Sequence, residues 1–154
     1  MEPYLAFTTT FIGKSNKLIS EAHIICNGED MYTNKALWDT GATRSCISHA
    51  VVSRLGLIPF SQTMMCGASG EKVCNVYLVD VVLRNNVTIK DVRVIEAELD
   101  IQRIDMLIGM DIIGLGDFAV TNVGGITKFT FRLPSVEEID FVKQIHEQDP
   151  DALQ

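Results

Sequence analysis

Short apolar and β-branched stretches, separated by turn-forming residues, dominate the hydrophobic pattern of this chain. Leu18–Cys26 and Lys35–Trp38 read as strands, and the Asn-Gly-Glu-Asp sequence at 27–30 predicts a turn between them. The other predicted strands are Lys72–Leu83, Val87–Ile95 and the arms of a hairpin, DFAVTN and ITKFTFRL, around 123–125. Many short strands at close spacing predict an all-β domain that is either closed or sandwiched.

Helical signals within this pattern are short. Ser48 is a favourable N-cap residue and predicts a helix over His49–Leu55, which ends at Gly56. Met110–Leu115 predicts one or two further helical turns before Gly116. Neither segment is long enough to change the fold class.

The C-terminal segment has an amphipathic pattern. Ser135 and Glu138 fit a capping box, which marks a helix start. Apolar residues then recur at helical spacing, at Val136, Ile139, Val142 and Ile145. We therefore expect an amphipathic helix over residues 135–147, followed by an acidic tail.

Composition limits the number of domains and the class of partner. A chain of 154 residues, 47% apolar and 21% charged, has the profile of a soluble globular protein and is too short for two ordinary domains. We expect residues 1–154 to form a single domain without repeats or linkers. The formal net charge of −7 argues against a nucleic-acid partner, because phosphate binding needs a basic face.

Signals for other compartments and for bound metals are weak. The N-terminal sequence MEPYLAFTTTF lacks the pattern of a secretory signal, and no stretch approaches the roughly 20 apolar residues that span a bilayer. We therefore expect the four cysteines to be reduced thiols in the cytoplasm. These are Cys26, Cys46, Cys66 and Cys74. We expect no metal site, no cofactor and no membrane partner.

The main chemical candidate is the aspartate in the sequence LWDTGAT at 37–43. A carboxylate at the end of an apolar strand is costly to desolvate unless something pairs with it or uses it. Taken alone, Asp39-Thr40-Gly41 is typical of a structural turn, in which Asp caps N–H groups and Gly takes positive φ. Two observations favour a function instead: the turn follows an apolar strand, and a second motif, DMLIGMDII, lies at 105–113.

Together, the two motifs resemble those of the retropepsin-like aspartic proteases. That family has two apolar residues before Asp-Thr-Gly-Ala, then a flap hairpin, and later two apolar residues before a glycine and a short helix. Leu37–Ala42 matches the first element and Leu107–Gly109 the last, and the resemblance covers residues 15–133. DMLIGMDII is similar to the version in cellular and bacterial members. The resemblance implies a single acid-protease β-barrel domain.

The resemblance also implies a mechanism, that of an aspartic endopeptidase. Two aspartates share one proton, because like charges about 3 Å apart cannot both ionise. The ionised aspartate activates a water that attacks the peptide carbonyl, and the protonated one assists the carbonyl and the leaving amine. This chain contains a single Asp-Thr-Gly sequence, and none of Asp80, Asp105 and Asp111 is followed by Thr-Gly. The implied assembly is a homodimer in which each subunit contributes Asp39.

Further site residues follow from the same resemblance. The catalytic set is Asp39, Thr40, which would hydrogen-bond across the two-fold axis, and Gly41, which would allow close backbone approach. Gly109 is assigned to tight packing beneath this loop. The residues expected to bind an extended peptide or protein substrate are Ala42 on the floor and Cys66, Gly67, Ala68 and Ser69 in the flap at 65–72.

Several positions depart from the retroviral pattern. The retroviral ion pair is absent, because Thr43 and Met110 stand where an acid and an arginine are usual. Trp38 is bulkier than the usual residue and is expected in the core or as a wall of the site. Retroviral dimers interleave terminal strands, whereas the apolar stripe over 135–147 suits packing on its own domain or a different dimer interface.

Three other hypotheses concern the same residues. The Asp-x-Gly-x-Thr sequence at 39–43 also fits the phosphate-binding turn of actin-like and sugar-kinase proteins, but that fold needs a much longer chain and further nucleotide motifs. A catalytically silent dimerisation or peptide-binding module remains open, and it would lose nothing when Asp39 becomes Asn. Cys66 and Cys74 would face each other if the hairpin were centred near Ser69-Gly70, which would make the flap redox-sensitive.

Overall fold

Six β-strands form a closed barrel in this protein, whose computed structural model describes residues 4–153. Around the barrel the strands follow the order β2 (Ile19–Cys26), β3 (Glu29–Trp38), β8 (Met106–Ile108), β4 (Cys46–Ser48), β7 (Thr88–Ala97) and β6 (Gly70–Val82). Pairing between β6 and β2 closes the ring. The predicted all-β barrel is confirmed.

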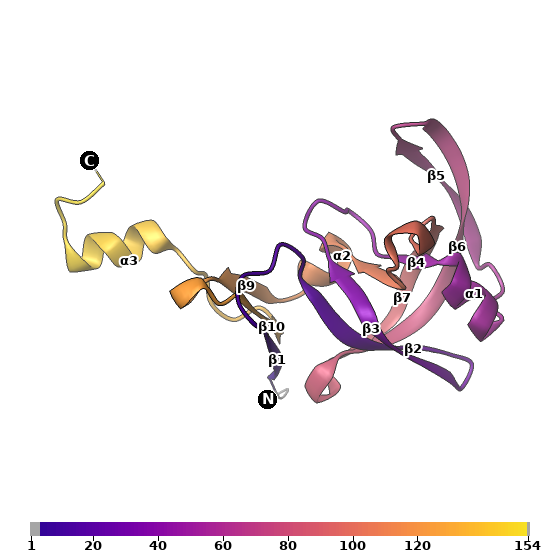
Figure 1. Cartoon of the computed structure of the whole chain (residues 1–154), viewed down its shortest axis with the longest axis horizontal. Helices are drawn as coiled ribbons and strands as arrows, with labels where there is room; N and C mark the ends of the chain where they lie inside the picture. Colours follow the sequence, from indigo (N-terminus) through magenta and orange to yellow (C-terminus); the bar gives the residue numbers. More distant parts are fainter. Residues whose placement is uncertain (1–3, 154) are drawn as a thin grey trace.

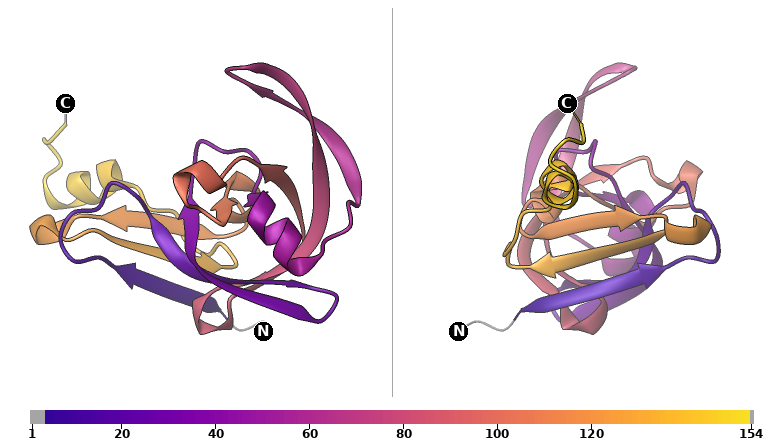
Figure 2. Two further views of the ribbon diagram at one scale, coloured as in Figure 1. Left: turned by 45° about the vertical axis from the view of Figure 1, so that its right-hand side comes forward. Right: turned by 90° about the vertical axis from the view of Figure 1, so that its left-hand side faces the viewer.

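A second, three-stranded sheet joins the two ends of the described chain. Its order is β1 (Leu5–Thr10), β10 (Lys128–Leu133) and β9 (Asp117–Thr121), and Figure 2 shows it beside the barrel. β1 pairs with β10 along its length, from Leu5 opposite Leu133 to Thr10 opposite Lys128. The sequence pattern does not predict β1, because the strand is recognised only once β10 is beside it.

Aromatic packing connects this sheet to the barrel. The Trp38 ring stacks on Phe118 at 5.5 Å between centroids and lies 5.0 Å from Phe131. Phe7 and Phe129, both nearly fully buried, complete the cluster. The indole N–H of Trp38 donates to Ser20 Oγ at 2.9 Å. Trp38 therefore belongs to the core, which decides between its two predicted roles.

A long hairpin rises from the barrel. β5 (Ser61–Gly67) pairs only with β6, which continues from the barrel into the hairpin, and the hairpin arches away from the body in Figures 1 and 2. Gly67 is paired with Gly70, so the tip consists of Ala68 and Ser69. The hairpin is thus centred earlier in the chain than the redox hypothesis requires.

The short helices agree with the sequence pattern. α1 (His49–Leu55) begins after Ser48, whose Oγ accepts the Val51 N–H at 3.3 Å, and it ends at Gly56 with a φ of 57°. α2 (Met110–Ile113) occupies the predicted segment before Gly116. The single-turn 3-10 helices are η1 (Arg84–Asn86), η2 (Asp100–Gln102) and η3 (Val123–Gly125).

The predicted start of the C-terminal helix is wrong. α3 spans Phe141–Gln148, and its N-cap is Asp140, whose carboxylate accepts the Lys143 N–H at 3.1 Å. Ser135 does not cap a helix because its hydroxyl donates to the carboxylate of Asp117. Because the Ser135 hydroxyl binds Asp117 instead of a helix N-terminus, residues 135–140 stay outside the helix.

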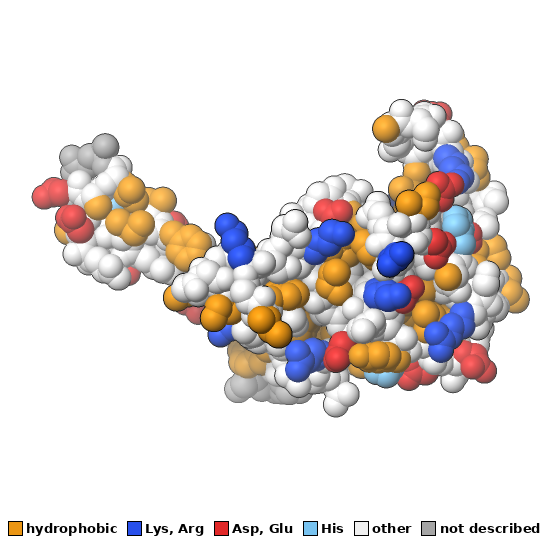
Figure 3. Space-filling model, viewed as in Figure 1, with side chains coloured by type: hydrophobic (Ala, Val, Ile, Leu, Met, Phe, Trp, Pro, Cys, Tyr) orange, Lys and Arg blue, Asp and Glu red, His pale blue; other side chains and the backbone are white. Residues whose placement is uncertain are grey.

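The apolar stripe of the C-terminal segment was expected to pack on its own domain, and this expectation is wrong. Every residue of α3 is exposed, and the helix stands apart from the barrel (Figures 1 and 3). Val136, Ile139, Val142 and Ile145 are between 41% and 53% exposed. Within residues 4–153, none of the helices is both long and apolar enough to cross a membrane.

Candidate active site

Asp39 lies directly after β3, at the entrance to a tight turn. Its backbone N–H donates to the Ile108 carbonyl at 2.8 Å, which continues the parallel pairing of β3 with β8. Its Oδ1 accepts the Gly41 N–H at 2.8 Å, and its carbonyl accepts the Ala42 N–H at 3.2 Å. The carboxylate is half-buried, while Thr40 and Gly41 are exposed. The turn thus presents Asp39 at the molecular surface in a fixed orientation.

The two sequence motifs are in direct contact. The Met110 N–H donates to the Ala42 carbonyl at 2.8 Å. A Cβ atom at Gly109 would lie 2.8 Å from both the Ala42 oxygen and the Arg44 carbonyl carbon, so no side chain fits there. The predicted place of Gly109, packed beneath the loop of Asp39, is confirmed.

A buried serine, hydrogen-bonded to an exposed aspartate, braces the segment 39–45, which we call the Asp39 loop. Ser45 donates its N–H to Asp111 Oδ2 at 2.9 Å and its hydroxyl to Asp111 Oδ1 at 2.7 Å. The same hydroxyl accepts the Gly109 N–H at 3.0 Å. Ser45 is fully buried, and Asp111 Oδ1 also accepts the Ile112 N–H at 3.0 Å. The sequence alone does not predict this pair. The signal that it offers is a serine, Ser45, directly before the apolar strand β4.

Cys46 follows this brace and lies under the loop. Burial, together with the negative charges of Asp111 and Asp39, raises the pKa of the Cys46 thiol to about 11. Cys46 shares a small apolar cluster with Cys74, Val76 and Ile95. It is therefore a protonated packing residue at neutral pH rather than a nucleophile.

The hairpin register argues against the hypothesis that Cys66 and Cys74 face each other, and both are free thiols, as expected. Cys74 is opposite Thr63, and Cys66 is opposite Glu71. Cys66 is exposed near the tip, while Cys74 is buried in the cluster with Cys46. The redox-sensitive hairpin therefore has no structural basis.

A groove of about 440 Å³, which we call the central groove, separates the Asp39 loop from the hairpin. Its walls are mostly apolar. Of the predicted substrate-binding residues, Ala42 and Cys66 line it. Its other apolar lining residues are Cys46, Met64, Met65, Ile95, Ala97, Leu99 and Leu107.

The other predicted binding residues lie at the hairpin tip. Gly67 and Ser69 line a neighbouring cavity of about 260 Å³, bordered by Cys74 and Glu96. Ala68 is exposed at the tip itself. The structure thus places Ala42 and Cys66 together across the central groove and sets the three tip residues beyond it.

The other aspartates considered in the sequence are engaged elsewhere. Asp80 binds Lys90 Nζ at 2.9 Å, and Asp105 accepts the Thr33 hydroxyl at 2.6 Å. Asp111 is held by Ser45. The described residues 4–153 also contain no group of three or more His, Cys, Asp or Glu side chains arranged to hold a metal ion.

Comparison with known proteins identifies the family of this chain. The family model of aspartyl proteases matches residues 22–112, which include the Asp39 loop, the hairpin and Gly109. The chain therefore belongs to the aspartyl protease family. A comparison with curated proteins found no match.

The comparison with solved structures concerns the fold. A retropepsin-like aspartic protease from Rickettsia conorii is 12% identical, with a TM-score of 0.53 over 86% of this chain and 97% of that one. The simian foamy virus (mac) protease is 22% identical, with a TM-score of 0.45 over 63% and 92% of the two chains. The EIAV protease, solved with the inhibitor HBY-793, is 20% identical, with a TM-score of 0.47 over 64% and 86%. The fold is retropepsin-like.

Proposed function

We propose that this protein is an aspartic endopeptidase in which two copies of the chain each contribute Asp39. The observation that carries this proposal is the setting of that carboxylate. It lies in a braced turn, half-exposed, beside an apolar groove that a long hairpin overhangs. A fixed carboxylate next to a peptide-sized groove has the elements that acid–base hydrolysis requires.

The proposed chemistry needs two carboxylates that share one proton. The ionised Asp39 takes a proton from a water molecule, which attacks the substrate carbonyl carbon. The protonated Asp39 of the other copy donates a hydrogen bond to the carbonyl oxygen as it becomes negative. Proton transfer to the leaving amine then breaks the C–N bond. Apparent pKa values would belong to the pair rather than to one residue.

Support for a homodimer comes from the surface of the Asp39 loop. Asp80, Asp105 and Asp111 are engaged in their own contacts, and we assign the second catalytic carboxylate to Asp39 of a second copy. Thr40 and Gly41 are exposed beside Asp39, where a symmetric copy would meet them. We assign Thr40 to contacts across the two-fold axis and Gly41 to close approach of the loops.

The groove suggests how the substrate binds. An extended peptide would lie over Ala42, with apolar side chains in the central groove and Cys66 on the opposite wall. The β5–β6 hairpin would act as a flap, with Gly67, Ala68 and Ser69 at its tip closing over the peptide and excluding water.

We also infer a reducing compartment such as the cytoplasm. All four cysteines are free thiols, and two of them are buried in the apolar cluster. The net charge of −7 supports peptide rather than nucleic-acid partners.

The test compares the wild type with Asp39→Asn on an unbiased peptide mixture, read by mass spectrometry from about pH 4 to pH 7.5. Asp30→Asn, at the other end of the same strand β3, is the matched control. Cleavage by the wild type and Asp30→Asn, but not by Asp39→Asn, would support the protease. If a folded dimeric wild type cleaves nothing, the protein is a peptide-binding or dimerisation module instead.

A further inference from the structure

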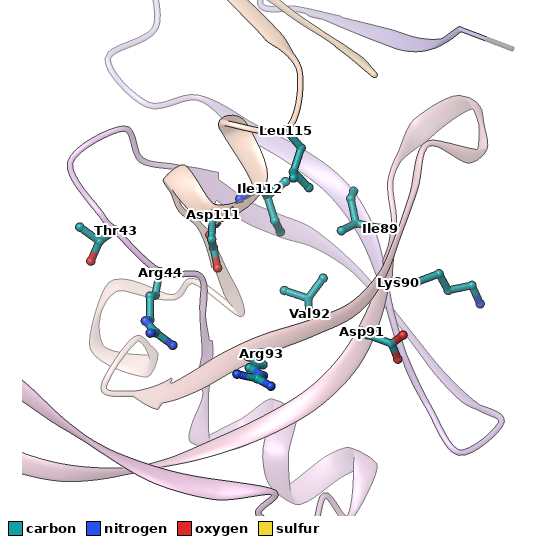
Figure 4. Close-up of a pocket in the computed structure, with 10 residues that line it drawn as sticks. All are labelled: Thr43, Arg44, Ile89, Lys90, Asp91, Val92, Arg93, Asp111, Ile112 and Leu115. Carbon is teal, nitrogen blue, oxygen red and sulfur yellow. Dashed lines mark hydrogen bonds between the residues drawn. The ribbon is translucent and has the colours of Figure 1, made fainter. Parts of the chain in front are cut away.

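A second cavity opens beside the Asp39 loop. It has a volume of about 480 Å³ and lies between the start of β7 and α2 (Figure 4). We call it the outer cavity. Arg44 lines both the outer cavity and the central groove. A peptide bound in the central groove therefore reaches the outer cavity by passing Arg44.

The outer cavity has an apolar floor along a free strand edge. Its floor residues are Ile89, Val92, Ile112 and Leu115. Among residues 4–153, β4 pairs with β7 only from Ile95 onward, whereas β6 pairs with the other edge of β7 from Thr88 to Ile95. The backbone of residues 89–93 thus borders the cavity without a neighbouring strand on that side.

The positive charges at the groove end of the cavity are two arginines. Within residues 4–153, neither Arg44 nor Arg93 forms a side-chain ion pair, although the Arg93 guanidinium lies 5.5 Å from the centre of the Phe60 ring. Figure 4 shows both guanidinium groups on the same side of the opening.

The other charged residues of the cavity are already engaged or point elsewhere. Asp111 accepts its hydrogen bonds from Ser45 and Ile112. Lys90 binds Asp80, and Figure 4 shows Lys90 and Asp91 at the far end of the cavity. The groove end therefore holds two guanidinium groups and one carboxylate, that of Asp111, which keeps its negative charge while it accepts these hydrogen bonds.

We infer that the outer cavity is a subsite that selects an acidic side chain in the substrate, and this inference rests on the proposed proteolytic function. The methylene groups of a glutamate would cover the apolar floor, and its carboxylate would accept hydrogen bonds from Arg44 and Arg93. Guanidinium groups suit this role because their planar donors match both oxygens of a carboxylate. The subsite makes the enzyme prefer peptides with a glutamate or aspartate several residues from the cleaved bond.

The experiment uses the homodimeric enzyme and decapeptides with a central Leu-Leu pair. Each flanking position carries Glu, Gln or Lys in turn, and kcat/KM is measured in low salt. At one flanking position we expect Glu to exceed Gln by about fivefold or more, and the ratio to shrink in high salt as the ion pair is screened. Arg44→Gln with Arg93→Gln should reduce the ratio to about one, and Arg44→Glu should favour Lys. Arg54→Gln, at the exposed end of α1, is the matched control and should leave the ratio unchanged.

Binding to Asp39→Asn separates failure of this inference from failure of the protease. The same peptides, labelled with fluorescein, are titrated with Asp39→Asn alone and combined with the two arginine substitutions. Cleavage without a Glu preference, or with one that survives both arginine substitutions, overturns the subsite but not the protease. Absent cleavage, with a Glu preference in binding that the arginine substitutions remove, overturns the protease but supports the subsite. Absent cleavage and absent binding overturn both.

Discussion

Ser45 and Asp111 form a two-point contact that connects the Asp39 loop to the first turn of α2. Both the N–H and the hydroxyl of Ser45 donate to the Asp111 carboxylate, and the same hydroxyl accepts the Gly109 N–H. The buried serine therefore has each of its polar groups satisfied, as a rigid support requires. The position of Asp39 depends on a residue that belongs to the other sequence motif.

Removing this brace should reduce turnover more than substrate binding. Asp111→Ala leaves the N–H and the hydroxyl hydrogen of the buried Ser45 without an acceptor. We expect kcat to fall about 10- to 100-fold with little change in KM, because the carboxylates are misplaced. Asp111→Asn retains one acceptor and should be intermediate. Ser45→Ala combined with Asp111→Ala should cost much less than the two single effects together. A fall in kcat/KM that comes from KM alone would argue against a positioning role.

Gly109→Ala should destabilise the fold strongly. Its Cβ would lie 2.8 Å from backbone atoms of Ala42 and Arg44, which cannot rotate away. We expect a loss of about 3 kcal/mol in the free energy of unfolding, measured by urea denaturation. Gly67→Ala is the control, since a Cβ there meets nothing within 4 Å and should change stability by less than about 0.5 kcal/mol. Equal effects of the two substitutions would contradict the packing described here.

Asp117 should make the stability of the second sheet depend on pH. Hydrogen bonds from Ser135, the Val136 N–H and Arg132 hold the pKa of this carboxyl well below its usual range. Its contribution is therefore present above the unfolded pKa of about 4 and is lost as pH falls toward the lower folded value.

Urea unfolding of the wild type and Asp117→Asn measures this dependence. The wild type should be the more stable of the two at pH 7, and the difference should shrink steadily below about pH 4. A difference that stays constant down to about pH 2 would show that the Asp117 charge has no role.

Alkylation rates should differ among the cysteines. The pKa of Cys46, raised to about 11, and its burial leave little accessible thiolate at pH 8, whereas Cys66 is exposed near the hairpin tip. Iodoacetamide in the native state should modify Cys66 first and Cys46 very slowly, as read by peptide mass spectrometry. All four cysteines should react at similar rates in urea. Rapid native labelling of Cys46 would contradict its placement in the core.

Elements that depend on neighbouring residues in the chain were the most predictable. The bounds of α1 agree with the sequence pattern because Ser48 and Gly56 fix both ends locally. The contact between the Asp39 loop and Gly109 was predictable only through the family resemblance, since nothing local connects the two segments.

Elements that depend on distant residues were not predictable. β1 needs β10 beside it, and the start of α3 moves because Asp117, 18 residues before Ser135, takes the capping hydroxyl. The Ser45–Asp111 pair, 66 residues apart, leaves no periodic signal in either segment. Each of these features depends on a single partner that hydrophobic spacing does not specify.

The pairing of β1 with β10 sets an order of events during synthesis. Trp38, adjacent to Asp39, is surrounded by Phe7 from β1 and by Phe129 and Phe131 from β10. During synthesis on the ribosome, Asp39 is added to the chain long before residues 128–133 emerge. Trp38 therefore initially lacks its neighbours from β10. Contacts so distant in sequence also form late during folding. The growing polypeptide therefore carries the aspartate without the core that supports it, and the site is assembled only after synthesis has passed β10.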